Sequence, residues 1–241
     1  MDYLKAIDKR ISRRTYLGTP IDTQKIAILI NLINKINKET GLSIAFIEDG
    51  SNAFRSLSKS YGMFQGVRSL IVLKGSTGVK DLKEKLGYYG EEIVLEATNL
   101  NLGTCWVGGT FDRKNPVFQV DGKEKLVCVI TIGNVAEDKS IREKMIYGLT
   151  HRKTRSMEEF YTADKAVPDW FRNGIKAVQK APSATNSQKY RFEYKNDVVK
   201  AFIPDNYEYD LVDLGIAKFH FELAAGGKFC VGNHGVYSPR S

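Results

Sequence analysis

Apolar residues recur at every third or fourth position in several stretches of the chain, which is the spacing of a helix with one buried face. This pattern predicts helices over residues 1–9, 23–38, 79–102, 170–180 and 210–225. Asp22 or Thr23 can cap the second of these helices, and the glycines at 226 and 227 end the last one. The segment 79–102 carries the longest apolar stripe. We interpret Gly87 and Gly90 within it as points of close packing against a neighbouring helix.

Short runs of β-branched and apolar residues predict strands at other places. These runs cover residues 42–47, 69–73, 126–133, 190–194 and 199–203. The last two are separated by Lys195, Asn196 and Asp197, which predict a hairpin turn. The polar and aromatic stretch 51–66 matches neither period. Helices interspersed with paired strands predict an α/β (α+β) fold.

Length and composition limit the class of protein without deciding it. A chain of 241 residues can form one large domain or two small fused ones. The first ten residues lack the apolar stretch of a signal peptide, and no run is long enough to span a membrane, so we expect a cytoplasmic protein. Cys105, Cys128 and Cys230 are too few and too scattered for a disulfide framework, and we expect them to be reduced and structural.

The chain is basic, with 36 Lys and Arg against 28 Asp and Glu, a formal net charge of +8. Such a charge raises the question of an anionic partner. The basic residues alternate with acidic ones, as in K-D-L-K-E-K at 80–85, and zinc-finger and RNA-binding signatures are missing, so we do not expect nucleic acid. The glycines at 75 and 78 match neither a P-loop nor a dinucleotide fingerprint. A phosphorylated small ligand and a solvated basic surface both remain open.

The stretch 181–191, A-P-S-A-T-N-S-Q-K-Y-R, is unusually dense in short hydrogen-bonding side chains. Its hydroxyl and amide groups both donate and accept, which suits a flat ligand with carbonyls and ring nitrogens. The alternative is a Ser/Asn-rich turn before a strand. Three further stretches are of interest: R-x-S-x-R at 10–14, L-G-T-C-W-V-G-G at 102–109, and K-T-R at 153–155. Each also has a plain interpretation, as a basic surface, a turn and a charge cluster respectively.

Together these segments resemble the nitroreductase family. P-S-A-T-N-S-Q is similar to the family's flavin-binding loop, which usually reads P-S-x-x-N-x-Q-P-W, with Lys189 and Tyr190 here in place of Pro and Trp at its substrate-facing end. R-x-S-x-R resembles the first flavin-phosphate motif, and 90–109 resembles the central helix and the loop after it. The resemblance implies a largely antiparallel sheet flanked by helices, and FMN as the cofactor. The residues it implies for cofactor binding are Arg10, Ser12, Arg14, Val107, Gly108, Gly109, Lys153, Arg155, Pro182, Ser183, Asn186 and Gln188.

The order of these motifs differs from an ordinary member of the family, in which P-S-x-x-N follows R-x-S-x-R by a few dozen residues. We interpret the chain as two fused, diverged halves, residues 1–160 and 161–241, that fold as a pseudo-dimer with one flavin site. The implied oligomeric state is a pseudo-dimeric monomer or a weak homodimer. Similarity between the halves is loose.

The implied reaction is hydride transfer from NAD(P)H to the flavin and then to a nitroaromatic, a quinone or a similar acceptor. Lys189 suggests an anionic acceptor. We expect neither a metal nor a general base, because the cofactor carries the chemistry and the histidines at 151, 220 and 234 have no evident partner. Two alternatives remain: dehalogenation or dehydrogenation on the same fold, and a non-enzymatic flavin-binding or basic interaction protein.

Overall fold

The computed structural model describes residues 2–54, 63–150 and 154–239. It divides into two compact units. Unit 1 consists of the described residues within 9–82 and 93–150. Unit 2 consists of the described residues within 2–8, 83–92 and 152–241.

The helices confirm the periodic pattern. They are α1 (Tyr3–Lys9), α2 (Thr23–Thr40), α4 (Leu82–Asn99), α5 (Ile141–Thr150), α6 (Asp169–Val178) and α7 (Asp210–Ala225), with short 3₁₀ turns η1 (Ser51–Phe54), η2 (Pro116–Phe118), η3 (Met157–Phe160) and η4 (Ala184–Asn186). Asp22 caps α2 by accepting hydrogen bonds from the N–H groups of Gln24 and Lys25, and Gly41 ends it in the left-handed region at φ 70°. Helix α5 was not predicted.

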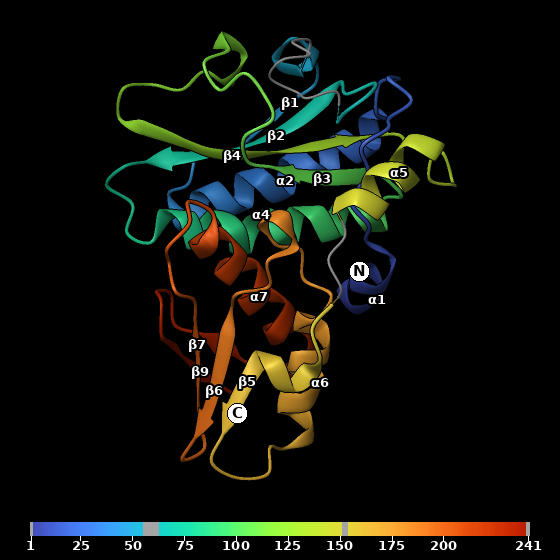
Figure 1. Ribbon diagram of the computed structural model, residues 1–241. Coiled ribbons are helices and arrows are strands. Elements are labelled where there is room, and N and C mark those ends of the chain that lie inside the picture. Colours follow the sequence, from blue (N-terminus) through green and yellow to red (C-terminus); the bar gives the residue numbers. More distant parts are fainter. Residues whose placement is uncertain (1, 55–62, 151–153, 240–241) are drawn as a thin grey trace. The chain divides into compact units, whose positions relative to one another are not determined.

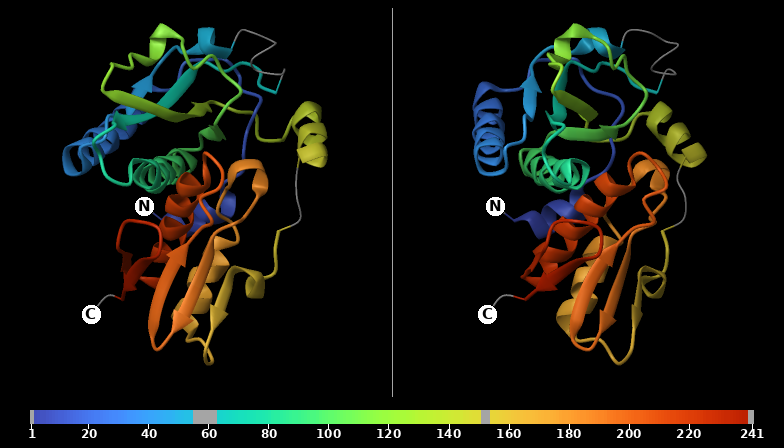
Figure 2. Two further views of the ribbon diagram at one scale, coloured as in Figure 1. Left: turned by 60° about the vertical axis from the view of Figure 1, so that its left-hand side comes forward. Right: turned by 90° about the vertical axis from the view of Figure 1, so that its left-hand side faces the viewer.

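Unit 1 contains, among its described residues, a four-stranded antiparallel sheet in the order β1-β2-β4-β3. Its strands are β1 (Ala45–Ile47), β2 (Ser69–Ser76), β3 (Gly103–Val107) and β4 (Glu124–Gly133). Strands β2 and β4 are buried along most of their length, as their unbroken apolar sequences require. The core of the unit includes Leu70, Val72, Val107, Phe118 and Val129. Figures 1 and 2 show α2 along one face of this sheet.

Unit 2 contains, within the described residues, a second sheet in the order β5-β6-β7-β9-β8. Its strands are β5 (Tyr161–Ala163), β6 (Arg191–Lys195), β7 (Val198–Phe202), β8 (Lys228–Phe229) and β9 (Gly235–Ser238). All the pairings are antiparallel except that of β5 with β6. Helix α7 packs on this sheet, where Phe221 stacks on Phe192 with ring centroids 5.1 Å apart.

Both sheets agree with the predicted fold class, a mixed α/β protein with largely antiparallel sheets flanked by helices. The two-unit division assigns α1 and the first half of α4 to the same unit as the C-terminal part of the chain. The predicted division, a single cut after residue 160, did not assign these two segments to the C-terminal part. The fused-halves interpretation stays a prediction. No helix in the described residues combines the length and apolar character that crossing a membrane requires.

Candidate functional site

The basic segment around residues 10–16 runs beside strand β3 in unit 1. Ser12 pairs with Thr104, and the Arg13 N–H donates to the Thr104 carbonyl at 2.8 Å. Further along, the Tyr16 N–H donates to the Gln65 carbonyl at 2.9 Å. Main-chain pairing therefore brings the first predicted motif alongside the strand that leads to Gly108 and Gly109.

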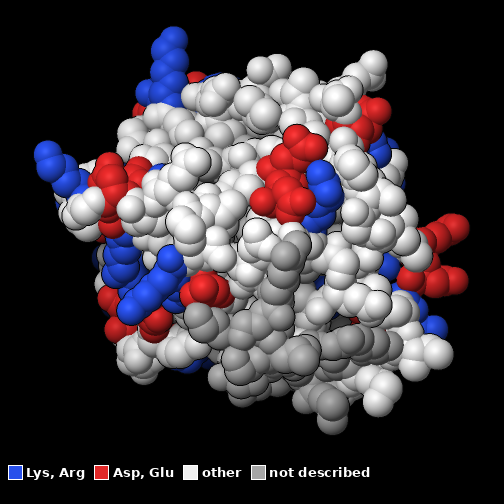
Figure 3. Space-filling view, turned by 90° about the horizontal axis from the view of Figure 1, so that it is seen from above, with Lys and Arg blue, Asp and Glu red and all other residues white. Residues whose placement is uncertain are grey.

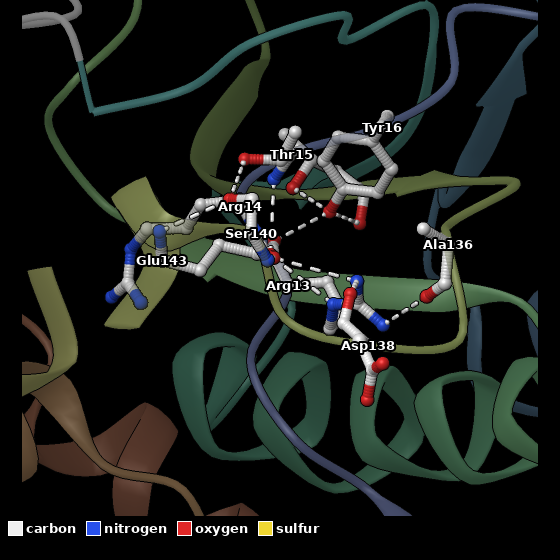
Figure 4. A network of polar contacts seen from close by, with 9 residues as sticks. Arg13, Arg14, Thr15, Tyr16, Ala136, Asp138, Ser140 and Glu143 are labelled. Carbon is white, nitrogen blue, oxygen red and sulfur yellow. Dashed lines mark hydrogen bonds and ion pairs between the residues drawn. The ribbon is translucent and has the colours of Figure 1, made fainter. Parts of the chain in front are cut away.

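Arg13, which sequence reasoning overlooked, is buried and holds this segment in place (Figure 4). Its Nε lies 3.1 Å from Glu143 Oε1, and its terminal nitrogens donate to the carbonyls of Ala136 and Asp138 at 2.9 and 3.2 Å. Glu143 also accepts the N–H groups of Arg14 and Thr15. Burial opposes ionisation of Glu143, but these hydrogen bonds prevail and lower its pKa to about 2.

Arg14 is oriented differently from Arg13, and its side chain points away from the Arg13 carbonyl partners in Figure 4. Its Nε is buried and has no hydrogen-bond partner within the described part of the chain. Burial raises the pKa of the Cys105 thiol, whereas the charges of Arg14 and Arg10 and a hydrogen bond with Ser12 act to lower it. All three predicted residues of the R-x-S-x-R motif thus influence one buried thiol of β3.

The backbone after β3 is held by Arg113, a second residue without a signal in the sequence. Its guanidinium donates to the carbonyl of Gly108 at 2.7 Å and to those of Leu126 and Val127 at 2.6 and 3.1 Å. A methyl group built on Gly109 would meet nothing within 4 Å, so packing does not require glycine there. Val107 is buried as the last residue of β3. Beyond β3, the Gly108 carbonyl is therefore held by Arg113, and the space beside Gly109 is open.

The polar loop Pro182–Gln188 lies in unit 2 and is ordered by hydrogen bonds. Ser183 Oγ accepts the Gln188 N–H at 3.0 Å, and both carboxyl oxygens of Asp213 lie 3.0 Å from the Ala184 nitrogen. The Gln188 side chain is buried, accepts the Arg155 N–H at 3.2 Å and donates to the Asn186 carbonyl. Asp213 is the anchor that sequence reasoning missed, because it lies 29 residues from Ala184.

Lys189 and Tyr190, which stand in place of the family's Pro and Trp, both have partners within unit 2. Tyr190 is fully buried, stacks on Phe160 and donates its hydroxyl hydrogen to the Ala181 carbonyl. Lys189 Nζ lies 3.2 Å from both carboxyl oxygens of the buried Asp210, so its charge is already matched. Tyr190 is therefore part of the core of unit 2, and Lys189 gives no support for an anionic acceptor.

The third predicted cluster is only partly visible. Lys153 lies outside the described residues, as does His151. Arg155 is in unit 2, with its side chain 36% exposed and its NH1 4.0 Å from Glu159. Arg191, not predicted, donates from NH1 to the carbonyls of Gln188 and Tyr190.

Two histidines can be assessed. His220 is buried, with Nε2 2.9 Å from Glu91 Oε1 and Nδ1 3.0 Å from the Ala177 carbonyl oxygen. The expectation that it has no evident partner is therefore wrong, although its role is structural. His234 stacks on Phe202 with centroids 4.9 Å apart.

Charge is mixed on the face drawn in Figure 3, where basic and acidic side chains stand side by side among uncharged ones. In that view the described atoms form no continuous basic stripe of the kind used to follow a nucleic-acid backbone. The surface seen there agrees with the dispersed charge of the sequence.

A model of the protein family described as "Putative TM nitroreductase" matches residues 2–225. Among solved structures, a nitroreductase-family protein of Thermotoga maritima MSB8 superposes with a TM-score of 0.66 at 21% identity, covering 98% of this chain and 92% of that chain. A nitroreductase with bound FMN from Bacteroides fragilis gives a TM-score of 0.46 at 16% identity, covering 58% of this chain and 92% of that chain. An FMN-dependent nitroreductase from Clostridium difficile R20291 gives 0.47 at 19% identity, covering 62% and 98%. No curated protein matches.

The Thermotoga maritima structure confirms the nitroreductase-like fold over almost the whole chain. The family match likewise extends across parts of both units in one stretch. The unusual order of motifs is thus compatible with a single family match that runs along most of the chain. An origin by fusion of half-units stays a prediction.

Proposed function

This chain belongs to the family described as putative TM nitroreductases, and from that premise we propose that it is an FMN-dependent oxidoreductase. In this proposal it passes a hydride from NAD(P)H through the flavin to a small acceptor such as a nitroaromatic or a quinone. Nitroreductases are oxidoreductases, so the class of activity follows from the family. The cofactor, the hydride donor and the acceptor belong to the proposal.

The observation that carries the proposal is the buried Nε of Arg14 without a hydrogen-bond partner in the described chain. An unsatisfied buried donor is costly, and an anionic oxygen would satisfy it with a charge-assisted bond. The charges of Arg10 and Arg14 and a hydrogen bond with Ser12 all act on the Cys105 thiol, which supports a common anion site for these three side chains. This donor set fits a phosphate monoester, and we assign Arg10, Ser12 and Arg14 to the phosphate of FMN. We add Lys153 and Arg155 as further cations from the sequence resemblance.

The loop and the backbone after β3 would serve the ring. Ser183 and Asn186 offer polar groups, Pro182 fixes the start of the loop, and Gln188 keeps the loop closed through its contacts with Arg155 and Asn186. Val107 and Gly108 are positioned by β3 and Arg113, and the open side of Gly109 leaves room for a flat ligand. When bound, the flavin supplies the hydride chemistry, and the protein supplies binding and orientation.

The first experiment is the spectrum of the purified chain after incubation with FMN. We expect a yellow protein with one flavin per chain, bleached by NADH or NADPH without oxygen and recoloured by a nitroaromatic or a quinone. Failure to take up any flavin would contradict the proposal. Flavin that NAD(P)H never reduces would indicate a non-enzymatic flavin-binding protein, and reduced protein that reacts only with halogenated substrates would indicate the dehalogenase alternative.

The second experiment tests the phosphate assignment with Arg14→Gln. We expect its FMN dissociation constant to rise about 10- to 100-fold, because a charge-assisted hydrogen bond contributes about 1.5–3 kcal/mol. Riboflavin, which lacks the phosphate, should bind equally to variant and parent. Arg172→Gln, which changes an exposed arginine of α6, is the matched control. Equal losses for FMN and riboflavin would remove Arg14 from the phosphate site.

A further inference from the structure

Asp213 is a buried carboxyl directly beside the loop Pro182–Gln188. It belongs to the first turn of α7 and is 2% exposed. Both of its oxygens lie 3.0 Å from the Ala184 nitrogen, which is thereby shared between them. The neighbouring Asp210 is engaged differently, by Lys189 and by the N–H groups of Asn206 and Tyr207. Asp213 is therefore directed at the loop, whereas Asp210 holds Lys189 and the turn that precedes α7.

The loop conformation is one that the chain would not adopt without such support. Thr185, Asn186 and Gln188 have φ angles of 52°, 52° and 49°, in the left-handed region. This region is unfavourable for most residues other than glycine, above all for the β-branched Thr185. A backbone of this kind persists only where surrounding contacts determine it. The Ala184 N–H bond to Asp213 fixes the loop immediately before these residues.

Burying the carboxyl group of Asp213 carries a desolvation cost. Burial raises the pKa of its carboxyl to about 8, against the opposing effect of the Ala184 N–H. An apolar side chain of similar size would avoid this desolvation cost. Strongly perturbed titratable groups next to a candidate binding loop point to a role in that loop rather than in fold stability.

We propose that Asp213 is a positioning residue for the flavin-binding loop. By accepting the Ala184 N–H on both oxygens, it sets the direction in which Ser183 and Asn186 present their polar groups to the ring. The inference rests on the proposed function for its ligand, but its structural half, the hold on Ala184, does not require flavin.

The test compares Asp213→Asn, which keeps an acceptor oxygen, with Asp213→Ala, which has none. We expect Asp213→Ala to raise the FMN dissociation constant at least about tenfold, the equivalent of one lost hydrogen bond. Asp213→Asn should remain within about threefold of the parent at pH 6.5, because its amide oxygen accepts the same N–H. Rescue by the amide distinguishes a positioning role from general destabilisation. Equal loss in both variants, or no loss in either, would overturn the proposal.

Two further measurements separate failure of this inference from failure of the proposed function. Hydrogen exchange at the Ala184 amide, followed in the flavin-free chain, should be slow in the parent and in Asp213→Asn but fast in Asp213→Ala. Slow exchange in all three would overturn the proposal even if no protein bound flavin. Glu84→Gln serves as a destabilised control, because Glu84 Oε1 lies 2.6 Å from Lys218 Nζ in a buried ion pair. This variant should lower the free energy of unfolding and leave the FMN dissociation constant unchanged. Weaker FMN binding in this control would attribute the Asp213 effects to stability and overturn the proposal.

Discussion

At the scale of single residues, two neighbouring arginines have opposite surroundings. Arg13 is 5% exposed and is paired with Glu143 and two carbonyl groups, so it fixes the backbone. Arg14 has its main-chain N–H on the same carboxylate, while its buried Nε has no hydrogen-bond partner in the described chain. Arg13 therefore stabilises the segment, whereas Arg14 is the residue proposed to bind phosphate.

Glu143→Gln tests the stabilising half of this arrangement. We expect a loss of about 3 kcal/mol at pH 7, because the buried guanidinium of Arg13 would lose its counter-charge. The pKa of Glu143 is lowered from 4.5 to about 2, so its contribution is fully present above pH 4.5 and is lost as the pH falls through about 2. Urea unfolding at a series of pH values should show the gap between parent and variant shrinking below about pH 4. Glu48→Gln, which removes an exposed partner of Arg68, should change stability by less than about 0.5 kcal/mol. A gap that is equal at pH 7 and pH 3 would contradict the assignment.

Asp213→Asn should have the opposite pH dependence. The pKa of Asp213 is raised from 3.8 to about 8 by burial, with Asp210 also raising it and the Ala184 N–H and Lys189 lowering it. Between these values the folded chain retains a proton that the unfolded chain has released, so stability falls as the pH rises, by at most about 1.4 kcal/mol per pH unit. Asparagine does not ionise, so the variant should gain on the parent from about pH 5 to pH 8. Unfolding curves that remain parallel over this range would show that Asp213 is not held neutral.

Residue-scale roles were the hardest to predict from the sequence. Ser183 and Asn186 could be named as candidates because their motif is local. Glu143 and Asp213 were missed because each acts on a segment far away in the chain, 130 residues in the case of the Arg13–Glu143 pair. The position of Tyr190 was likewise left open by the sequence. An aromatic residue after a polar loop can face a ligand or the core, and only the packing against Phe160 decides between them.

At the scale of elements, helix α7 approaches the first half of α4 closely within unit 2. A methyl group on Gly87 would lie 2.1 Å from the Val212 carbonyl oxygen, and one on Gly215 would lie 2.0 Å from the Glu84 carbonyl oxygen. Gly87 was predicted to mark close helix packing, and this is confirmed. The atoms in the way are backbone atoms, so a change of side-chain rotamer cannot make room for an added methyl group at either glycine.

Gly215→Ala should therefore destabilise the protein by about 3 kcal/mol or more, despite the better helix propensity of alanine. The matched control is Gly148→Ala in α5, where an added methyl group meets nothing within 4 Å. That variant should gain about 0.5–1 kcal/mol from propensity alone. Thermal unfolding of both variants measures the difference. Similar melting temperatures for the two would show that the α4–α7 contact adapts.

Long helices with a regular apolar pattern and clear capping residues were predicted well. Helix α7 has the predicted bounds Asp210–Ala225, and α2 extends only two residues beyond the predicted end at Lys38. Helix α5 was missed, and Ile141 and Met145, which are 79% and 64% exposed, explain why. Strands β5, β8 and β9 have two to four residues, too few to establish alternation.

At the scale of the whole molecule, unit 2 is assembled from three separate parts of the chain. Residues 83–92 contribute Glu84 and Glu91, whose carboxylates pair with Lys218 and His220 of α7. All four side chains are 4% exposed or less, so each buried polar group depends on a partner from the other segment. A cut at the apparent sequence boundary would separate these partners.

Residues 152–241, expressed alone, should consequently fail to fold. The fragment would leave Lys218 and His220 without their carboxylates and would expose the surface of α7 against which Gly87 packs. An uncompensated buried charge alone costs about 3–5 kcal/mol, a large part of the stability of a small domain. Circular dichroism and amide proton dispersion of the fragment should show an unfolded or aggregated chain. A longer fragment, in which residues 83–92 are joined to 152–241 by a flexible linker, should recover part of the native signal, because it restores both carboxylate partners. Cooperative unfolding of the unmodified fragment would instead show that residues 152–241 fold without the segment 83–92.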